Sequence, residues 1–278
     1  MASITDCVVE GLKYPFNDIK KLLGFGILFV IFDLISMAFT LKTVDVTKGI
    51  INTLEKTNVT ASTLGYSHLP HGDVYLAIAM LIVGFIVLLF ILGYQYNVIG
   101  FSIDRKDDLP GFDDILGMFI KGIKYLFVTI VYSIPSMVVL FLAIMVTNNS
   151  YVWPVLMIIS VLLSLICYLI LIMALNNMVA HDSLKKAFDF REIIGNISNL
   201  GWGKYLGTVI FTVIVFMIIN LAVGVILSFL TVIFAAAINN QAIVISTAIS
   251  VIEALFVTSY CSVFFNRVCG SIYRESVK

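Results

Sequence analysis

Three polar side chains lie deep inside stretches of sequence that are otherwise apolar. Asp33 and Glu253 each stand near the middle of such a stretch, and Asn220 stands at a comparable depth in another. An ionised carboxylate at mid-membrane depth costs at least about 2.5 kcal/mol, so each carboxyl group is expected to be protonated, paired or facing water. Two interpretations follow. The three residues form a proton or cation site, or they are neutral groups that hydrogen-bond between helices.

The elements that would hold these residues are six apolar stretches. The chain has 278 residues, of which 60% are hydrophobic and 12% charged, and its mean hydropathy is +1.06. Soluble domains carry about twice that share of charge. A span of about 20 residues crosses a hydrocarbon core of about 30 Å as a helix. We therefore predict an all-α polytopic membrane protein with spans at approximately Leu22–Leu41, Val74–Val98, Tyr125–Thr147, Val152–Leu175, Tyr205–Ala237 and Ala242–Phe265.

The positive charges are divided unequally between the two ends of these spans. Of the 17 lysines and arginines, all but Lys42, Lys48 and Lys56 fall on the side that carries both termini. Because cations gather on the cytoplasmic side of membrane proteins, we expect a multi-pass cell-membrane protein with both termini in the cytoplasm. The segment 42–73 becomes one external loop, in which Asn58 begins a glycosylation sequon. The zero net charge argues against nucleic-acid binding.

A short pattern precedes each odd-numbered span and predicts a helix at the membrane surface. A phenylalanine is followed two residues later by a carboxylate and then by an isoleucine, and the pattern runs from Phe16 to Ile19, from Phe112 to Ile115 and from Phe190 to Ile193. Phe119 extends the second copy into an apolar stripe with helical spacing. Each copy predicts an amphipathic interfacial helix on the cytoplasmic face.

The same pattern divides the single membrane domain into three repeat units. Their approximate ranges are 10–100, 101–180 and 181–278, and each is predicted to contain an interfacial helix and a transmembrane hairpin. Three such hairpins can form one six-helix bundle. Pro135 removes a backbone donor inside the third span and predicts a kink there.

The central third of the chain resembles a known family. The residues that carry the resemblance are Gly93-Tyr94, Leu109-Pro110-Gly111-Phe112-Asp113-Asp114, Lys121-Gly122-Ile123-Lys124 and Val131-Tyr132-Ser133-Ile134-Pro135. They are similar to an archaeal integral-membrane family known as domain of unknown function four-thousand-thirteen, although its members usually carry an aromatic residue where this chain has Ile115. The resemblance implies a membrane location and topology and transfers no mechanism.

The sequence contains no motif for catalysis. No P-loop, nucleophile elbow or H-E-x-x-H motif occurs, and the loop residues His68, His71 and Asp73 lack a fourth metal ligand. We therefore expect no enzyme, cofactor or metal site. We predict a non-enzymatic role in membrane or envelope organisation, with membrane lipids as partners. The alternative is a proton-coupled or small-solute transporter in which Asp33, Asn220 and Glu253 serve a solute or cation.

Overall fold

The structure is a computed structural model that describes residues 3–57, 71–148, 151–237 and 242–277. These residues form helices and contain no strand. The elements are α1 (Ile4–Lys13), a 3-10 turn η1 (Tyr14–Asp18), α2 (Ile19–Thr57), α3 (His71–Ile103), α4 (Ile115–Met145), α5 (Val152–Ala180), a 3-10 turn η4 (Leu184–Phe188), α6 (Phe190–Leu200), α7 (Trp202–Ala237), α8 (Ala242–Ile252), a π-helical turn η5 (Glu253–Thr258) and α9 (Ser259–Ser276). Six helical segments are long and apolar enough to cross a membrane, which confirms the predicted all-α class.

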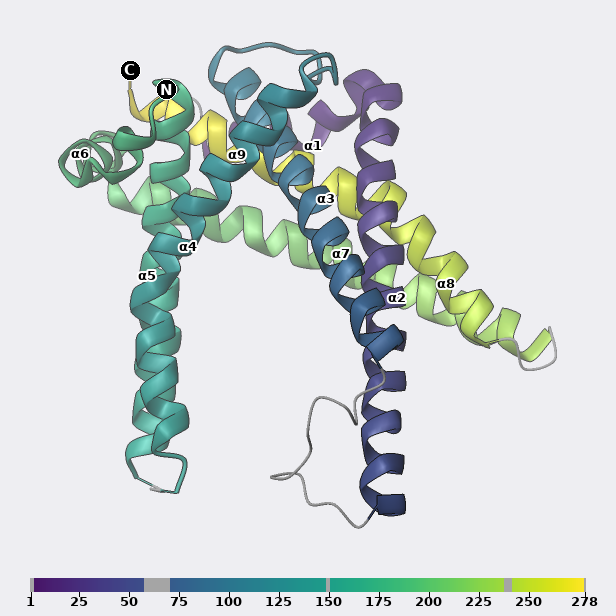
Figure 1. The fold of residues 1–278 in the computed structure, drawn as a ribbon. Helices are drawn as coiled ribbons and strands as arrows, with labels where there is room; N and C mark the ends of the chain where they lie inside the picture. The colour runs from purple at the N-terminus through teal and green to yellow at the C-terminus, as the bar shows by residue number, and fades with distance from the viewer. Residues whose placement is uncertain (1–2, 58–70, 149–150, 238–241, 278) are drawn as a thin grey trace.

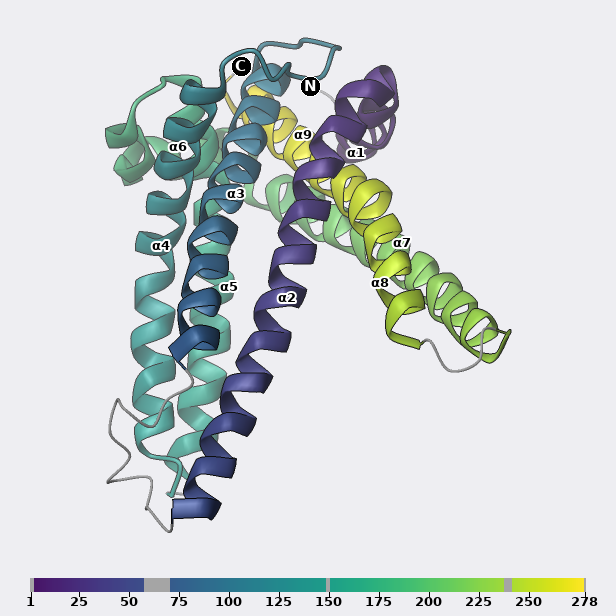
Figure 2. The same cartoon turned by 45° about the vertical axis from the view of Figure 1, so that its right-hand side comes forward.

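Two pairs of helices form two legs that extend in the same direction. The first leg is made by α2 and α3, and the second by α4 and α5, as Figures 1 and 2 both show. At their upper ends α3 also packs against α4 and α9. The continuous rod of α8, η5 and α9 runs with α7 obliquely to the legs and projects to one side (Figure 2).

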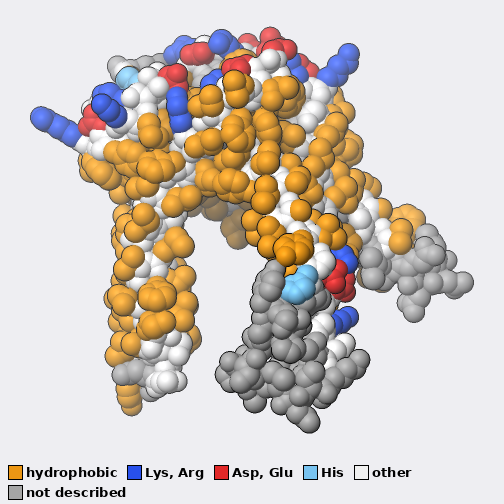
Figure 3. Space-filling view, in the orientation of Figure 1, with side chains coloured by type: hydrophobic (Ala, Val, Ile, Leu, Met, Phe, Trp, Pro, Cys, Tyr) orange, Lys and Arg blue, Asp and Glu red, His pale blue; other side chains and the backbone are white. Residues whose placement is uncertain are grey.

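The surface of the molecule separates into a charged end and apolar legs. Figure 3 shows most lysine, arginine, aspartate and glutamate side chains at the end that carries both termini, and an open space between the legs. Large apolar side chains such as Leu81, Phe141 and Val161 are exposed along the legs. An exposed apolar surface of this extent marks a membrane contact, because water would not solvate it favourably.

The motif at Gly93 and Tyr94 has a packing role near the charged end. Tyr94 stacks between Phe25 of α2 and Phe112, with ring centroids 4.2 and 4.9 Å away. A Cβ atom at Gly93 would overlap the carbonyl oxygen of Met118, so glycine lets α3 and α4 approach closely. The family-like residues therefore join the two legs.

The predicted interfacial helices differ from those in the structure. Phe112 lies in the loop before α4, and Ile115 begins α4, where the Asp114 side chain accepts a hydrogen bond from the Gly117 N–H. The helix then continues without a break, so the stripe that includes Phe119 forms the first turns of the span itself. The first copy is not a separate helix either, because Phe16 lies in η1 and Ile19 begins α2.

Only the third copy forms a separate short helix before its span. This helix, α6, exposes Phe190 but buries Ile193 in the protein core, so part of its apolar face contacts protein. The three-unit repeat remains a prediction, since α7 and the rod cross the legs obliquely.

The predicted external loop at 42–73 is shorter in the structure. Residues 42–57 continue α2, and α3 begins at His71. The Lys42 ammonium lies 3.1 Å from the Asp73 carboxylate, and this ion pair joins α2 to α3 at this end. His68 and Asn58 lie outside the described residues, so the interpretations placed on them stay predictions.

Candidate functional site

The structure does not join the three mid-span polar residues through contacts. Asp33 is half-buried in α2 and Glu253 is exposed at the start of η5, and neither forms a hydrogen bond or ion pair with a residue that the structure describes. The amide of Asn220 donates to the Phe216 carbonyl at 2.8 Å and to the Cys261 sulfur at 3.6 Å. Among the described residues, Asn220 therefore makes polar contacts within α7 and with α9, and none with Asp33 or Glu253.

Pro135 lies inside α4, which continues on both sides of it as one helix. The Ser133 hydroxyl donates to the Thr129 carbonyl, and the Ser136 hydroxyl donates to the Ser133 carbonyl. A groove of about 470 Å³ lies beside these serines, between α4 and α5. The predicted kink is not needed to account for this groove, and it stays a prediction.

Asn220 lines a cavity of about 640 Å³ to which all six spans contribute, here called the central cavity. The described residues that line it include amides, hydroxyls, aromatic rings and a thiol, but no charged side chain. They are Phe29 of α2, Gln95 of α3, Tyr125 of α4, Tyr168 of α5, Val213, Phe216, Met217 and Asn220 of α7, Thr258 of η5, and Cys261, Ser262, Phe265 and Asn266 of α9.

A smaller cavity of about 110 Å³, the inner cavity, adjoins the central one toward the charged end. The two cavities share the lining residues Tyr125, Tyr168, Phe265 and Asn266. Asn176 of α5 also lines the inner cavity, and it lies four residues before Ala180, the last residue of that helix. At a rise of about 1.5 Å per residue, the inner cavity therefore begins about 6 Å below the end of the helix.

Three asparagines at these cavities share one hydrogen-bonding arrangement. Asn176, Asn220 and Asn266 each donate from the side-chain amide to the backbone carbonyl four residues earlier, at 2.7 to 2.8 Å. A backbone carbonyl only accepts, so this contact fixes which side-chain atom is nitrogen. Within the described parts of the chain, no donor reaches the Oδ1 atom of any of the three.

The Oδ1 atom of Asn176 is fully buried and has no partner. An unsatisfied buried acceptor costs about 1–3 kcal/mol, so a native structure that keeps one needs a reason for it. Asn176 is 0% exposed although it lines the inner cavity, so a donor in that cavity, from water or a ligand, reaches this oxygen only when neighbouring side chains move.

The central cavity opens sideways, at the level of the membrane. Met217 lines it and is 63% exposed, and Thr258 on the same wall is exposed as well. The π-helical turn η5 packs closely against α2 at this wall. Gly26 of α2 allows this approach, because a Cβ atom there would overlap the Leu255 carbonyl of the turn. Such turns occur frequently at functional sites.

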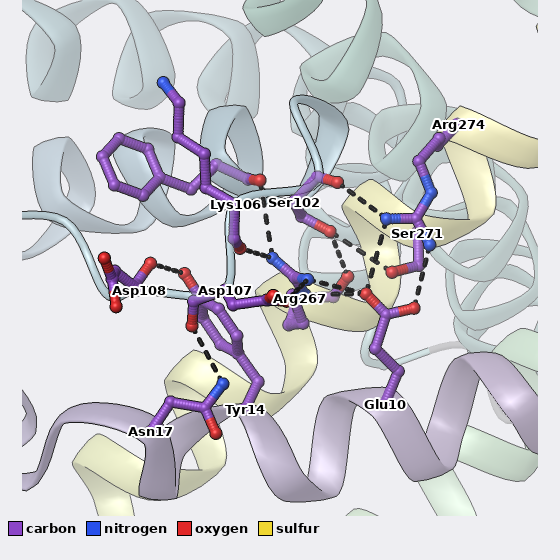
Figure 4. Close-up of polar contacts among 11 residues, drawn as sticks. Glu10, Tyr14, Asn17, Ser102, Lys106, Asp107, Asp108, Arg267, Ser271 and Arg274 are labelled. Carbon is purple, nitrogen blue, oxygen red and sulfur yellow. Dashed lines mark hydrogen bonds and ion pairs between the residues drawn. The ribbon is translucent and has the colours of Figure 1, made fainter.

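A buried cluster of charges, the arginine cluster, lies beside Asn266 on α9. The Glu10 carboxylate accepts hydrogen bonds from Arg267 Nε at 3.0 Å and from Arg274 at 2.8 Å, and it forms an ion pair with Arg267 Nη2 at 2.7 Å (Figure 4). Arg267 is only 3% exposed, donates to the Lys106 carbonyl at 2.6 Å and lies 4.1 Å from the centre of the Tyr14 ring. The cluster joins α1, the loop after α3, and α9.

The arginine cluster positions α9 and leaves little capacity for a ligand. Ser102 on α3 donates from its hydroxyl to the Arg267 carbonyl, and a Cβ atom at Gly270 would overlap the Ser102 side chain. Sequence reasoning counted Arg267 and Arg274 as cytoplasmic cations only. Their partner Glu10 is too distant in the chain for spacing to reveal it.

A second, exposed ion pair joins α4 to the turn that follows α5. The Lys124 ammonium donates to Asp182 at 3.0 Å, and the Tyr96 hydroxyl donates to it at 2.9 Å. The hydrogen bonds from Lys124 and Tyr96 hold the pKa of the Asp182 carboxyl below its usual value. In the described parts of the chain, no three His, Cys, Asp or Glu side chains are arranged to hold a metal.

A family model described as "Protein of unknown function (DUF4013)" matches residues 76–231, which is more than half of the chain. The chain belongs to this family. The resemblance seen in the central third of the sequence is therefore confirmed. No curated protein and no solved structure matches the chain.

The DUF4013 match runs from α3 into α7 and so includes much of the candidate site. Gln95, Tyr125, Asn176 and Asn220 lie within it, whereas Asn266 lies beyond its end. Sequence reasoning found Asn220 but missed Asn176 and Asn266. The available signal was an asparagine inside or beside an apolar stretch, which for Asn176 is the Asn176-Asn177 pair at the end of α5.

Proposed function

We propose that this integral membrane protein binds a membrane lipid in its central cavity and has a non-enzymatic role in membrane or envelope organisation. One observation carries the proposal: all six spans line an uncharged cavity that opens sideways between apolar helices. Concave, mostly apolar sites with a few polar groups are the usual form of small-molecule sites.

The distribution of side chains suits a ligand with a polar end and an apolar end. Phe29, Val213 and Met217 form an apolar outer part, whereas Asn176 and Asn266 lie toward the inner end. A lipid that entered sideways would keep its chains in the space between the legs (Figure 3) and place its headgroup inside. The excess of cations at the charged end supports a cytoplasmic position for that end.

The transporter alternative has less support. A proton-coupled mechanism would need Asp33 or Glu253 at the solute site, but of the three predicted residues only Asn220 lines the central cavity. An ion in that cavity would also meet no opposite charge among its described lining residues. Lipid binding is therefore the function that we propose.

The proposal is tested by narrowing the cavity with a larger side chain. Val213→Phe places a ring in the central cavity, and Val138→Phe makes the same change on α4 at a site that is 52% exposed and does not line that cavity. Each protein is purified in detergent, and retained lipid is measured by mass spectrometry. We expect Val213→Phe to lower the retained lipid severalfold and Val138→Phe to leave it unchanged. Equal retention in both variants would overturn the proposal.

A further inference from the structure

The hydrogen-bonding groups at the cavities indicate the chemistry of the headgroup. We propose that the bound lipid has an uncharged headgroup with hydroxyl groups, which donate to Asn176, Asn220 and Asn266. A monoglycosyl diacylglycerol, whose sugar carries several hydroxyl groups, is a lipid of this class, whereas a diacylglycerol has one hydroxyl group and can donate to only one of the three asparagines. This inference rests on the proposed lipid-binding function and adds a specificity to it.

The three asparagines require a donor from the ligand. Each amide nitrogen is already committed to its own helix at 2.7 to 2.8 Å, which leaves the carbonyl oxygen as the free group. For Asn176 this oxygen lies beside the inner cavity without accessible surface, so a ligand hydroxyl reaches it only when neighbouring side chains move. An oxygen of this kind binds a hydroxyl or an N–H group and repels an ionised phosphate.

The absence of charge from the described lining residues of both cavities argues against ionic headgroups. A phosphate there would be buried without a cation, which is costly. The nearest arginine in sequence is Arg267, next to Asn266, but its guanidinium is committed to Glu10 and to the Lys106 carbonyl.

The inner cavity has room for one end of an uncharged headgroup with hydroxyl groups. Its volume of about 110 Å³ holds on the order of three water-sized groups, so the rest of the headgroup would lie in the central cavity. Tyr125, Tyr168 and Phe265 line the passage to the central cavity and present apolar ring surfaces to the carbon skeleton of such a group. The depth of Asn176, about 6 Å below the end of α5, places this cavity close to the depth of lipid headgroups.

The test compares lipids that differ only in headgroup. The full-length protein is delipidated in detergent and titrated with diacylglycerol, glucosyl diacylglycerol, phosphatidylcholine and phosphatidic acid that carry the same acyl chains, with bound lipid counted by native mass spectrometry. The variants are Asn176→Leu and Asn266→Leu, which replace an amide with an apolar group of similar size. Ser164→Ala is the control, because Ser164 lines the groove between α4 and α5 and is not among the residues that line the central or inner cavity.

We expect the two uncharged lipids to bind at least tenfold more tightly than phosphatidic acid and phosphatidylcholine. Each asparagine variant loses one hydrogen bond and should weaken the binding of glucosyl diacylglycerol about fivefold to tenfold, while Ser164→Ala changes nothing. Equal binding of all four lipids, or unchanged binding in both asparagine variants, would overturn the headgroup assignment and leave lipid binding intact. Failure of every lipid to bind would overturn the proposed function itself.

Discussion

The arginine cluster and the inner cavity are close together on α9 but differ in what their polar groups contact, although each region has one buried atom without a partner among the described residues, Nε of Arg274 in the cluster and Oδ1 of Asn176 beside the cavity. In the cluster, the buried Arg267 guanidinium meets both a carboxylate and a backbone carbonyl. In the cavity, the Oδ1 atom of Asn176 is buried and meets no donor. An unsatisfied buried group lowers stability, and such sacrifices are typical of functional sites. The comparison supports a structural role for the cluster, whose two arginines pair with Glu10, and agrees with the ligand-binding role that we propose for the cavity.

The largest effect is expected when the cluster loses its carboxylate. Glu10→Gln leaves the buried Arg267 guanidinium with only the exposed Asp107 carboxylate, 4.0 Å away, as a counter-charge, and we expect the free energy of unfolding to fall by about 3 kcal/mol. Unfolding in detergent, followed by circular dichroism, measures this. Asp104→Asn is the control, because the Asp104–Lys106 pair is exposed and should contribute less than about 1 kcal/mol. Similar losses in both variants would mean that the cluster is no more structural than a surface pair.

The contact between α9 and α3 supports both regions, so separating the two helices should damage both. Gly270→Ala places a Cβ atom against Ser102 and 3.0 Å from the Ile99 carbonyl, and we expect a loss of about 1–3 kcal/mol together with weaker lipid retention. Gly203→Ala in α7 has open space around it and is the matched control, with no loss expected. If Gly270→Ala unfolds like the control, the close approach of these helices is not essential.

Asn176→Leu should have the opposite effect on stability from the two changes above. The variant removes the unsatisfied acceptor and fills space beside apolar neighbours, so we expect the free energy of unfolding in lipid-free detergent to stay equal or to rise by up to about 1 kcal/mol. The same unfolding measurement decides the matter. A loss of 2 kcal/mol or more would show that Asn176 is part of the stabilising core, and the contrast between the two regions would disappear.

Much of the fold was predictable because long apolar runs have few ways to fold in a membrane. All six predicted spans correspond to long helices. The start of the third span was not predictable from the stripe at Phe112 and Phe119, because a surface helix and the first turns of a span give the same periodicity over so few residues. The structure settles this with Asp114, which caps α4 at Ile115.

Less of the candidate site was predictable, because its polar groups are defined by their partners. The charges of Asp33 and Glu253 made them candidates in the sequence, whereas the asparagines that line the inner cavity are Asn176 and Asn266. Whether an asparagine is satisfied depends on neighbours from other helices. Asn177 shows this: it differs from Asn176 only in having Lys186 and Tyr273 as partners.

The smallest effect is expected at the exposed pair of Asp182 and Lys124, which sharpens the contrast with the buried cluster. Because Lys124 and Tyr96 lower the pKa of Asp182, its contribution to stability is present above the ordinary aspartate pKa of about 3.9 and is lost as the pH falls through the lower value. With Asp182 74% exposed, we expect Asp182→Asn to cost no more than about 1 kcal/mol at pH 7 and nothing near pH 2. Unfolding midpoints of both proteins across this range test the sign, and a difference that persisted at the acid end would show that the contact does not depend on charge.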